Sequence, residues 1–95
     1  MSLKNTVCII TGSGSGIGKA SALKMAKEGA QIVLVGRTSS KLKSVESEIN
    51  SSGGISKSFA LDVADSTAVH AMATEVIKEF GGIDILVNNA GHNSP

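Results

Sequence analysis

Short apolar runs alternate with longer amphipathic segments along this chain. We interpret the apolar runs as strands, and they lie at residues 6–11, 31–36, 56–63 and 83–89. The segments between them have apolar residues at helical spacing and predict helices at residues 16–30, 39–54 and 64–82. Strands that alternate with helices of this length indicate a parallel sheet with right-handed crossover connections.

The three predicted helices carry apolar stripes that mark their buried faces. The expected buried residues are Ile17, Ala20, Leu23 and Ala26 in the first helix, Leu42, Val45 and Ile49 in the second, and Val69, Met72, Val76 and Phe80 in the third. Gly29 and Gly81 stand where C-terminal caps are expected, and Asp65 or Ser66 is the expected N-cap of the third helix.

Together these elements predict an α/β fold with a doubly wound parallel sheet, in which four strands in the order 3-2-1-4 are covered by three helices. The first two helices would share one face, and the third would lie alone on the other. That face and the outer edge of the fourth strand would then have too little cover. We therefore expect residues 1–95 to form an incomplete domain that continues beyond Pro95.

Composition limits the classes of function. The chain has 95 residues, 41% of them apolar and 18% charged, which is typical of one small globular domain. A net charge of +1 and the absence of Trp and Tyr argue against a nucleic-acid partner. No apolar run is long enough to span a membrane, and no His/Cys cluster has the spacing of metal ligands. The single cysteine, Cys8, is expected to be a buried core residue, which fits a cytoplasmic, reducing location.

The segment TGSGSGIG, residues 11–18, joins the first strand to the first helix. Glycine permits positive φ and close approach of the backbone, and N–H groups converge at a helix N-terminus, so this turn predicts a phosphate-binding site. The ATP-type loop G-x-x-x-x-G-K-[ST] does not fit, because Ser13 and Ala20 occupy two of its fixed positions. The pattern G-x-G-x-x-G fails as well, because Ile17 and Lys19 stand where its third glycine belongs.

The pattern that does fit is T-G-x-x-x-G-x-G, formed by Thr11, Gly12, Gly16 and Gly18. With LDV at 61–63 and NNAG at 88–91, each at the end of a predicted strand, the chain resembles the short-chain dehydrogenase/reductase family over residues 4–91. The resemblance implies a Rossmann-type fold and the NAD(P)-binding portion of an oxidoreductase.

The resemblance also implies roles for individual residues. Those expected to meet the cofactor are Gly12, Ser13, Ser15, Gly16, Ile17 and Gly18 in the glycine turn, Arg37 after the second strand, Asp62 and Val63 after the third, and Asn89, Ala90 and Gly91 after the fourth. Within the turn, Gly12 would make the sharp bend and Gly18 would let the helix pack closely. The serines, Gly16 and Ile17 would meet the phosphates and the adjoining ribose. Asp62 and Val63 would hold adenine, and the last three residues would line the ribose on the nicotinamide side. Asp84 and Asn88 are expected to be structural.

The end of the second strand bears on the choice between NADP and NAD. A carboxylate at this position would favour NAD, but the chain has Gly36 followed by Arg37. Because a guanidinium pairs well with phosphate, NADP is the expected cofactor. The alternative is that Arg37 is a solvated surface charge. Lys41 and Lys43 are read as a solvated face, although either can reach a 2′-phosphate. Ser15 stands where NADP-preferring relatives often carry a basic residue.

Members of this family transfer hydride between nicotinamide and a carbonyl or alcohol, using a tyrosine, a lysine four residues later and a serine. This chain has no tyrosine, so we assign no catalytic residue. We interpret it as the amino-terminal cofactor half of a longer enzyme, a homo-oligomer when complete, that acts on a small carbonyl or alcohol. A stand-alone, non-catalytic nucleotide-binding or regulatory protein is the alternative.

Overall fold

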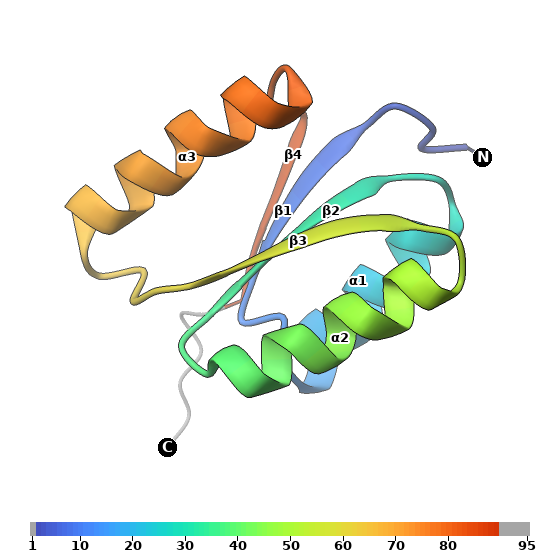
Figure 1. The fold of residues 1–95 in the computed structure, drawn as a ribbon, viewed down its shortest axis with the longest axis horizontal. Helices are drawn as coiled ribbons and strands as arrows, with labels where there is room; N and C mark the ends of the chain where they lie inside the picture. Colours follow the sequence, from blue (N-terminus) through green and yellow to red (C-terminus); the bar gives the residue numbers. More distant parts are fainter. Residues whose placement is uncertain (1, 90–95) are drawn as a thin grey trace.

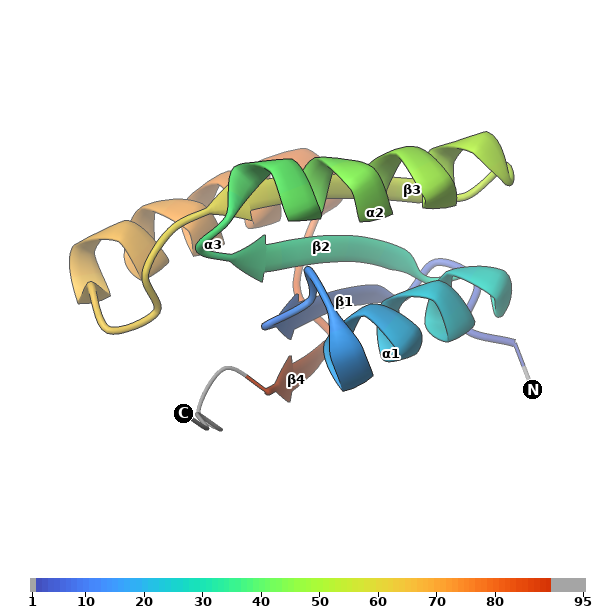
Figure 2. The same ribbon diagram turned by 90° about the horizontal axis from the view of Figure 1, so that it is seen from below.

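The computed structural model describes residues 2–89, which form one parallel sheet with helices on both faces (Figure 1). The strands are β1 (Val7–Thr11), β2 (Gln31–Gly36), β3 (Ile55–Ala60) and β4 (Ile85–Asn88). The helices are α1 (Gly16–Lys27), α2 (Ser39–Ser51) and α3 (Ser66–Phe80). The sheet order is β3-β2-β1-β4 with every pairing parallel, which confirms the predicted fold. In Figure 2, β1, β2 and β4 point in the same direction.

The two central strands, β1 and β2, are buried on both faces, and their side chains alternate between two apolar layers. In one layer, α1 and α2 pack on the sheet, and its buried residues are Cys8, Ile10, Ala22, Ala30, Ile32, Leu34, Leu42, Val45 and Ile49. In the other, α3 packs on the opposite face, and its buried residues are Val7, Ile9, Val33, Val35, Met72 and Val76. The predicted apolar stripes of α2 and α3 therefore face the core, as expected.

The stripe predicted for α1 is wrong at its first two positions, because Ile17 is 78% exposed and Ala20 is also exposed. Leu23 and Ala26 are partly buried and pack against the core, as predicted. The fully buried residues of this helix are Gly18 and Ala22. Each step of three residues falls about 60° short of a full turn, so a stripe built only from such steps drifts around the helix. At the start of the helix the inward face instead follows a step of four from Gly18 to Ala22.

The ends of the helices differ in how they are capped. The Asp65 side chain accepts a hydrogen bond from the N–H of Ala68 at 3.1 Å, and Gly81, with φ of 89°, ends α3, both as predicted. Gly29, with φ of 100°, follows α1 in the same way. Ser15 and Thr38 precede α1 and α2, and neither side chain caps its helix. The N–H groups at these two N-termini are thus left without a side-chain acceptor.

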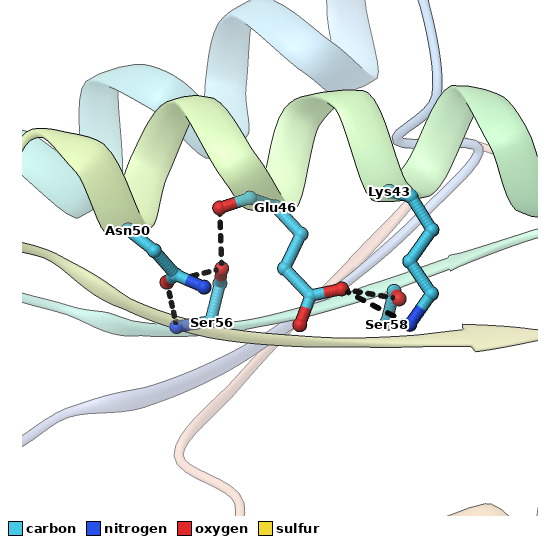
Figure 3. Close-up of polar contacts among 5 residues, drawn as sticks. All are labelled: Lys43, Glu46, Asn50, Ser56 and Ser58. Atoms are coloured by element: carbon cyan, nitrogen blue, oxygen red, sulfur yellow. Dashed lines mark hydrogen bonds and ion pairs between the residues drawn. The ribbon is translucent and has the colours of Figure 1, made fainter.

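Edge strand β3 is held to α2 by polar contacts, which Figure 3 shows. Ser58 Oγ donates to Glu46 Oε1 at 2.7 Å, and Asn50 Oδ1 accepts from both the N–H and the hydroxyl of Ser56, at 3.2 and 3.0 Å. Lys43 lies on the solvent side of the same cluster, with its Nζ 3.5 Å from Glu46 Oε1. Serines therefore face α2 here, where the central strands present aliphatic side chains.

The opposite edge of the sheet has little cover. Leu86 of β4 pairs in register with Ile9, whose side chain faces α3, yet Leu86 is 63% exposed. Ile77 of α3 and Ile83 before β4 are also exposed. Asp84 anchors the start of β4, since its side chain accepts from the N–H of Val7 at 2.8 Å, which agrees with the structural role expected for it. Among residues 2–89 no helix has the length and apolar character needed to cross a bilayer.

Cys8 provides a test of the packing between the sheet and α1. Burial raises the pKa of the Cys8 thiol from 9.0 to about 11. We expect a thiol reagent at pH 8 to label Cys8 only at the rate at which the chain unfolds, and denaturant to restore fast labelling. Because the thiol ionises more easily in the unfolded chain, stability should fall as the pH rises from about 9 towards 11. Fast labelling without denaturant would contradict this packing.

The exposed edge predicts self-association of the chain. An apolar, unpaired edge strand offers hydrogen-bonding groups and apolar surface to a second copy. We expect Leu86→Lys to shift the chain towards monomer in sedimentation experiments, because a charge on the edge opposes this pairing. Thr74→Lys, which adds the same charge to an exposed position on α3, is the control and should have no such effect. A wild-type chain that stays monomeric at high concentration would show that the exposed edge of β4 does not cause self-association.

Candidate functional site: the edge of the sheet at the strand carboxyl ends

The turn between β1 and α1 requires glycine at two kinds of position. Gly12 and Gly16 have positive φ, 65° and 59°, which favours glycine on conformational grounds. At position 18 glycine is required for a steric reason, because a Cβ added to Gly18 would lie 2.1 Å from the carbonyl oxygen of Gly12. This close approach sets the N-terminus of α1 directly against the end of β1. The N–H groups of the first turn of α1, which have no acceptor within the helix and no side-chain cap from Ser15, therefore lie at the edge of the sheet.

Ser13 supports this turn from inside the protein. Its side chain is fully buried, and its Oγ accepts a hydrogen bond from the N–H of Val35 at 3.0 Å. The N–H of Ser13 donates to the carbonyl oxygen of Val35 at 3.3 Å. Ser13 therefore ties the turn to β2, and its hydroxyl points away from the surface of the turn. Ser15 and Ile17, by contrast, are exposed on that surface.

Thr11 joins the turn to the end of β4. Its Oγ1 donates to Asn88 Oδ1 at 3.0 Å and accepts from the N–H of Asn89 at 2.9 Å. Asn88 thus has the structural role expected for it. The side-chain Nδ2 of Asn89 is buried and has no hydrogen-bond partner within residues 2–89. A buried amide without a partner is costly, and it points to a polar group that would complete the site. Ala90 and Gly91 lie outside the described residues.

A recess of about 210 Å³ lies where the glycine turn meets the end of β2. Its lining residues are Gly12, Gly14, Ser15, Gly36, Arg37, Thr38, Lys41 and Leu42. Arg37 and Lys41 are exposed cations, and the lining holds no carboxylate. Within the described part of the chain, neither side chain forms an ion pair or a hydrogen bond. The recess is therefore a cationic hollow beside the glycine turn.

Asp62 and Val63 follow β3 at the same edge of the sheet, because the N–H of Leu61 extends the ladder to the carbonyl oxygen of Gly36 at 2.8 Å. Asp62 is exposed, and its Oδ1 accepts from the N–H of Ala64 at 2.9 Å. Val63 is 41% exposed. The turns after β1, β2 and β3 all leave the sheet at this end (Figure 1). The fold therefore brings the described residues of the predicted site, from four segments of the chain, to one edge of the sheet.

A larger hollow of about 890 Å³ lies between α1 and α2 near the ends of both helices, and it is not the candidate site. Small and aliphatic residues such as Ala26, Gly54 and Ile55 line much of it, and it borders the start of β3. In open α/β sheets ligands bind at the carboxyl ends of the strands, which is the opposite edge. The smaller recess lies at that edge and adjoins the glycine turn.

Comparison with known proteins agrees with this geometry. The family model described as short chain dehydrogenase matches residues 6–95. The chain belongs to the short-chain dehydrogenase family. It is 42% identical to an uncharacterized oxidoreductase of Mycobacterium tuberculosis over 94 residues, which are 96% of this chain and 28% of that protein.

Solved structures of other proteins share the fold. A metagenomic short-chain oxidoreductase, crystallised in complex with NADP, matches with a TM-score of 0.91 and 44% identity over 97% of this chain and 42% of its own. An NAD⁺-bound xylitol dehydrogenase matches with a TM-score of 0.91 and 36% identity over 97% of this chain and 35% of its own. The chain therefore spans less than half the length of each of these proteins.

The site fits a nicotinamide dinucleotide, as the family implies. The close Gly12–Gly18 contact sets the N-terminus of α1 at this edge, where an anion is favoured, and the Asn89 amide is an unused donor at the other end of the edge. The link from Thr11 to β4 is a feature that the sequence pattern does not predict, although Thr11 stands at the head of the motif. Lys41 is exposed, as predicted, and it also lines the recess.

Gly18 supplies a test of the turn. We expect Gly18→Ala to destabilise the chain by about 3 kcal/mol, because the new methyl group must displace the Gly12 carbonyl. Gly82→Ala is the matched control, since a Cβ at Gly82 meets nothing within 4 Å. Urea denaturation of both variants compares their free energies of unfolding. Equal stability of the two variants would show that α1 does not need this close approach.

Proposed function

We propose that this chain is the amino-terminal, dinucleotide-binding part of an oxidoreductase that transfers hydride between NADP(H) and the carbonyl or alcohol group of a small molecule. The observation that carries the proposal is the approach of Gly18 to the Gly12 carbonyl, which sets the first turn of α1 at the end of β1 beside a cationic recess. When bound, the nicotinamide supplies or accepts the hydride. The residues of this chain bind and orient the cofactor.

The dinucleotide would extend along the edge of the sheet from β3 to β4. The N–H groups at the start of α1 would hold the pyrophosphate, with Ser15 and Ile17 beside it. The exposure of the Ile17 side chain, 78%, supports this role, because a bound cofactor would cover it. Asp62 and Val63 would flank adenine. Asn89, with Ala90 and Gly91, would face the ribose on the nicotinamide side.

The residues at the end of β2 favour NADP over NAD. Solved structures that match this chain include one in complex with NADP and one bound to NAD⁺, so the choice between the two cofactors depends on local residues. No carboxylate lines the recess that the adenosine ribose would occupy. Arg37 lines it without an ion-pair partner in the described residues, which leaves its guanidinium available to a 2′-phosphate.

We place the catalytic acid/base and the residues that choose the substrate outside these 95 residues, because the chain has no tyrosine. The relatives that it matches are longer and include proteins named as oxidoreductases, which favours this proposal over a stand-alone regulatory protein. We further propose that the complete enzyme is a cytoplasmic homo-oligomer. The lone buried Cys8 fits a reducing compartment, and the exposed Leu86 edge fits association.

Cofactor titrations test the proposal. We expect the chain to bind NADPH more tightly than NADH, and Arg37→Ala to weaken NADPH binding about tenfold or more while leaving NADH binding nearly unchanged, because only NADPH carries the charged 2′-phosphate. Quenching or enhancement of nicotinamide fluorescence measures both affinities. Lys78→Ala, which removes an exposed cation from α3, is the control for net charge. Failure to bind either dinucleotide would overturn the proposed function.

A further inference from the structure

The hollow between α1 and α2 is a second concave surface of the chain, and its lining is largely aliphatic. The two helices lie on the same face of the sheet (Figure 1), and the hollow of about 890 Å³ lies between them. Of its lining residues, Ala30 and Ile49 are buried, Leu23 and Ala26 are partly buried, and Ile55 is 55% exposed. Hollows of about 300 to 1,000 Å³ with a mainly apolar lining are typical binding sites of small molecules.

The backbone around this hollow has already used its hydrogen-bond donors. The N–H groups that follow the two helices donate to carbonyl oxygens in the last turns of those helices, at 3.0–3.1 Å, and they belong to Gly29, Ala30, Ser52, Gly53 and Gly54. Among residues 2–89, no residue of the lining has a buried side-chain polar atom without a partner. A polar group placed inside the hollow would therefore lose its hydrogen bonds to water without replacement, so the interior suits a hydrocarbon.

Two exposed cations line the same hollow from the last turn of α1. They are Lys24 and Lys27, and within the described residues neither side chain forms an ion pair or a hydrogen bond. The carboxylate of the lining is that of Glu48, and Lys19 Nζ lies 3.9 Å from its Oε1. Like charges three positions apart on a helix repel each other, and an anion beside them relieves this repulsion. The lysines therefore favour a ligand with a negatively charged group.

We propose that the hollow between α1 and α2 binds a small amphipathic anion, of which a long-chain carboxylate is the simplest example. The hydrocarbon chain would lie between the helices, where the aliphatic lining has no free polar atom, and the carboxylate would lie beside Lys24 and Lys27. The inference goes beyond the proposed function and does not depend on it, because this hollow lies at the edge of the sheet opposite the glycine turn.

Titration of the ¹⁵N-labelled chain with laurate, below its critical micelle concentration, tests the inference. We expect the backbone amide shifts that change to belong to residues of the hollow such as Leu23, Ala26 and Ile49. Dodecyltrimethylammonium, which has an alkyl chain of similar length and a positive head group, should bind about tenfold more weakly, because the lysines repel it. Saturating NADPH should leave the affinity for laurate unchanged, since the two sites lie at opposite edges of the sheet.

Removal of the two lysine charges tests the contact with the carboxylate. We expect the double variant Lys24→Ala, Lys27→Ala to bind laurate about tenfold more weakly, because two exposed charge pairs together are worth about that much. The matched control is the double variant Lys43→Ala, Lys78→Ala, which removes the same charge from exposed positions outside the hollow. It should bind laurate like the wild type. All proteins are compared at a temperature at which each is folded.

A substitution that fills the hollow tests the place of the hydrocarbon chain without changing charge. Ala20 lines the hollow and is exposed, so we expect Ala20→Phe to fold and to weaken laurate binding, whereas Ala71→Phe at an exposed position of α3 should not. The inference is overturned if laurate does not bind, if it changes shifts only outside the hollow, or if both head groups bind equally well. It is also overturned if Ala20→Phe, unlike Ala71→Phe, converts a self-associating chain to monomer, because a second copy would then occupy the hollow.

Discussion

The rest of the site depends on the contact between the Gly12 carbonyl and the backbone of Gly18. Because only a hydrogen atom at Gly18 fits against this oxygen, the first turn of α1 packs directly against the turn that follows β1, and its unpaired N–H groups lie at the edge of the sheet. In the same turn, Ser13 is buried against β2, whereas Ser15 and Ile17 are exposed. One steric constraint therefore sets both the donors that a phosphate can reach and the side chains that surround it.

The two apolar layers keep that turn in line with the ends of the neighbouring strands. Since β1 and β2 are buried on both faces, neither strand can slip without exposing aliphatic side chains. Polar contacts then fix the outer strands. Ser56 and Ser58 hold β3 to α2, and Asp84 and Thr11 hold β4 to β1. The carboxyl ends of all the strands thus meet at one edge, where the cationic recess and the buried Asn89 amide lie at different points.

The sequence predicted the elements whose burial leaves a regular apolar pattern. It did not predict the features of the structure that depend on contacts between distant segments of the chain. The runs at β1 and β2 and the stripes of α2 and α3 predicted the sheet order and both layers correctly. The start of the inward face of α1 was not predicted, because Gly18 and Ala22 pack through small size and not through apolar bulk. The close approach of the Lys41 Cβ to Gly14 depends on how α2 packs against the glycine turn. The local sequence pattern does not predict that packing. The serines of β3 likewise reveal their role only when Glu46 and Asn50 are placed beside them.

The central claim is that the edge formed by the glycine turn and the strand carboxyl ends binds a nicotinamide dinucleotide. Mapping of backbone amide chemical shifts in ¹⁵N-labelled protein during an NADPH titration tests it most directly. We expect the shifts that change to belong to the turn from Gly12 to Gly18, to the segment around Arg37, and to Asp62 and Val63. Changes confined to the hollow between α1 and α2, around Ala26 and Gly54, would contradict the claim, as would the absence of any change.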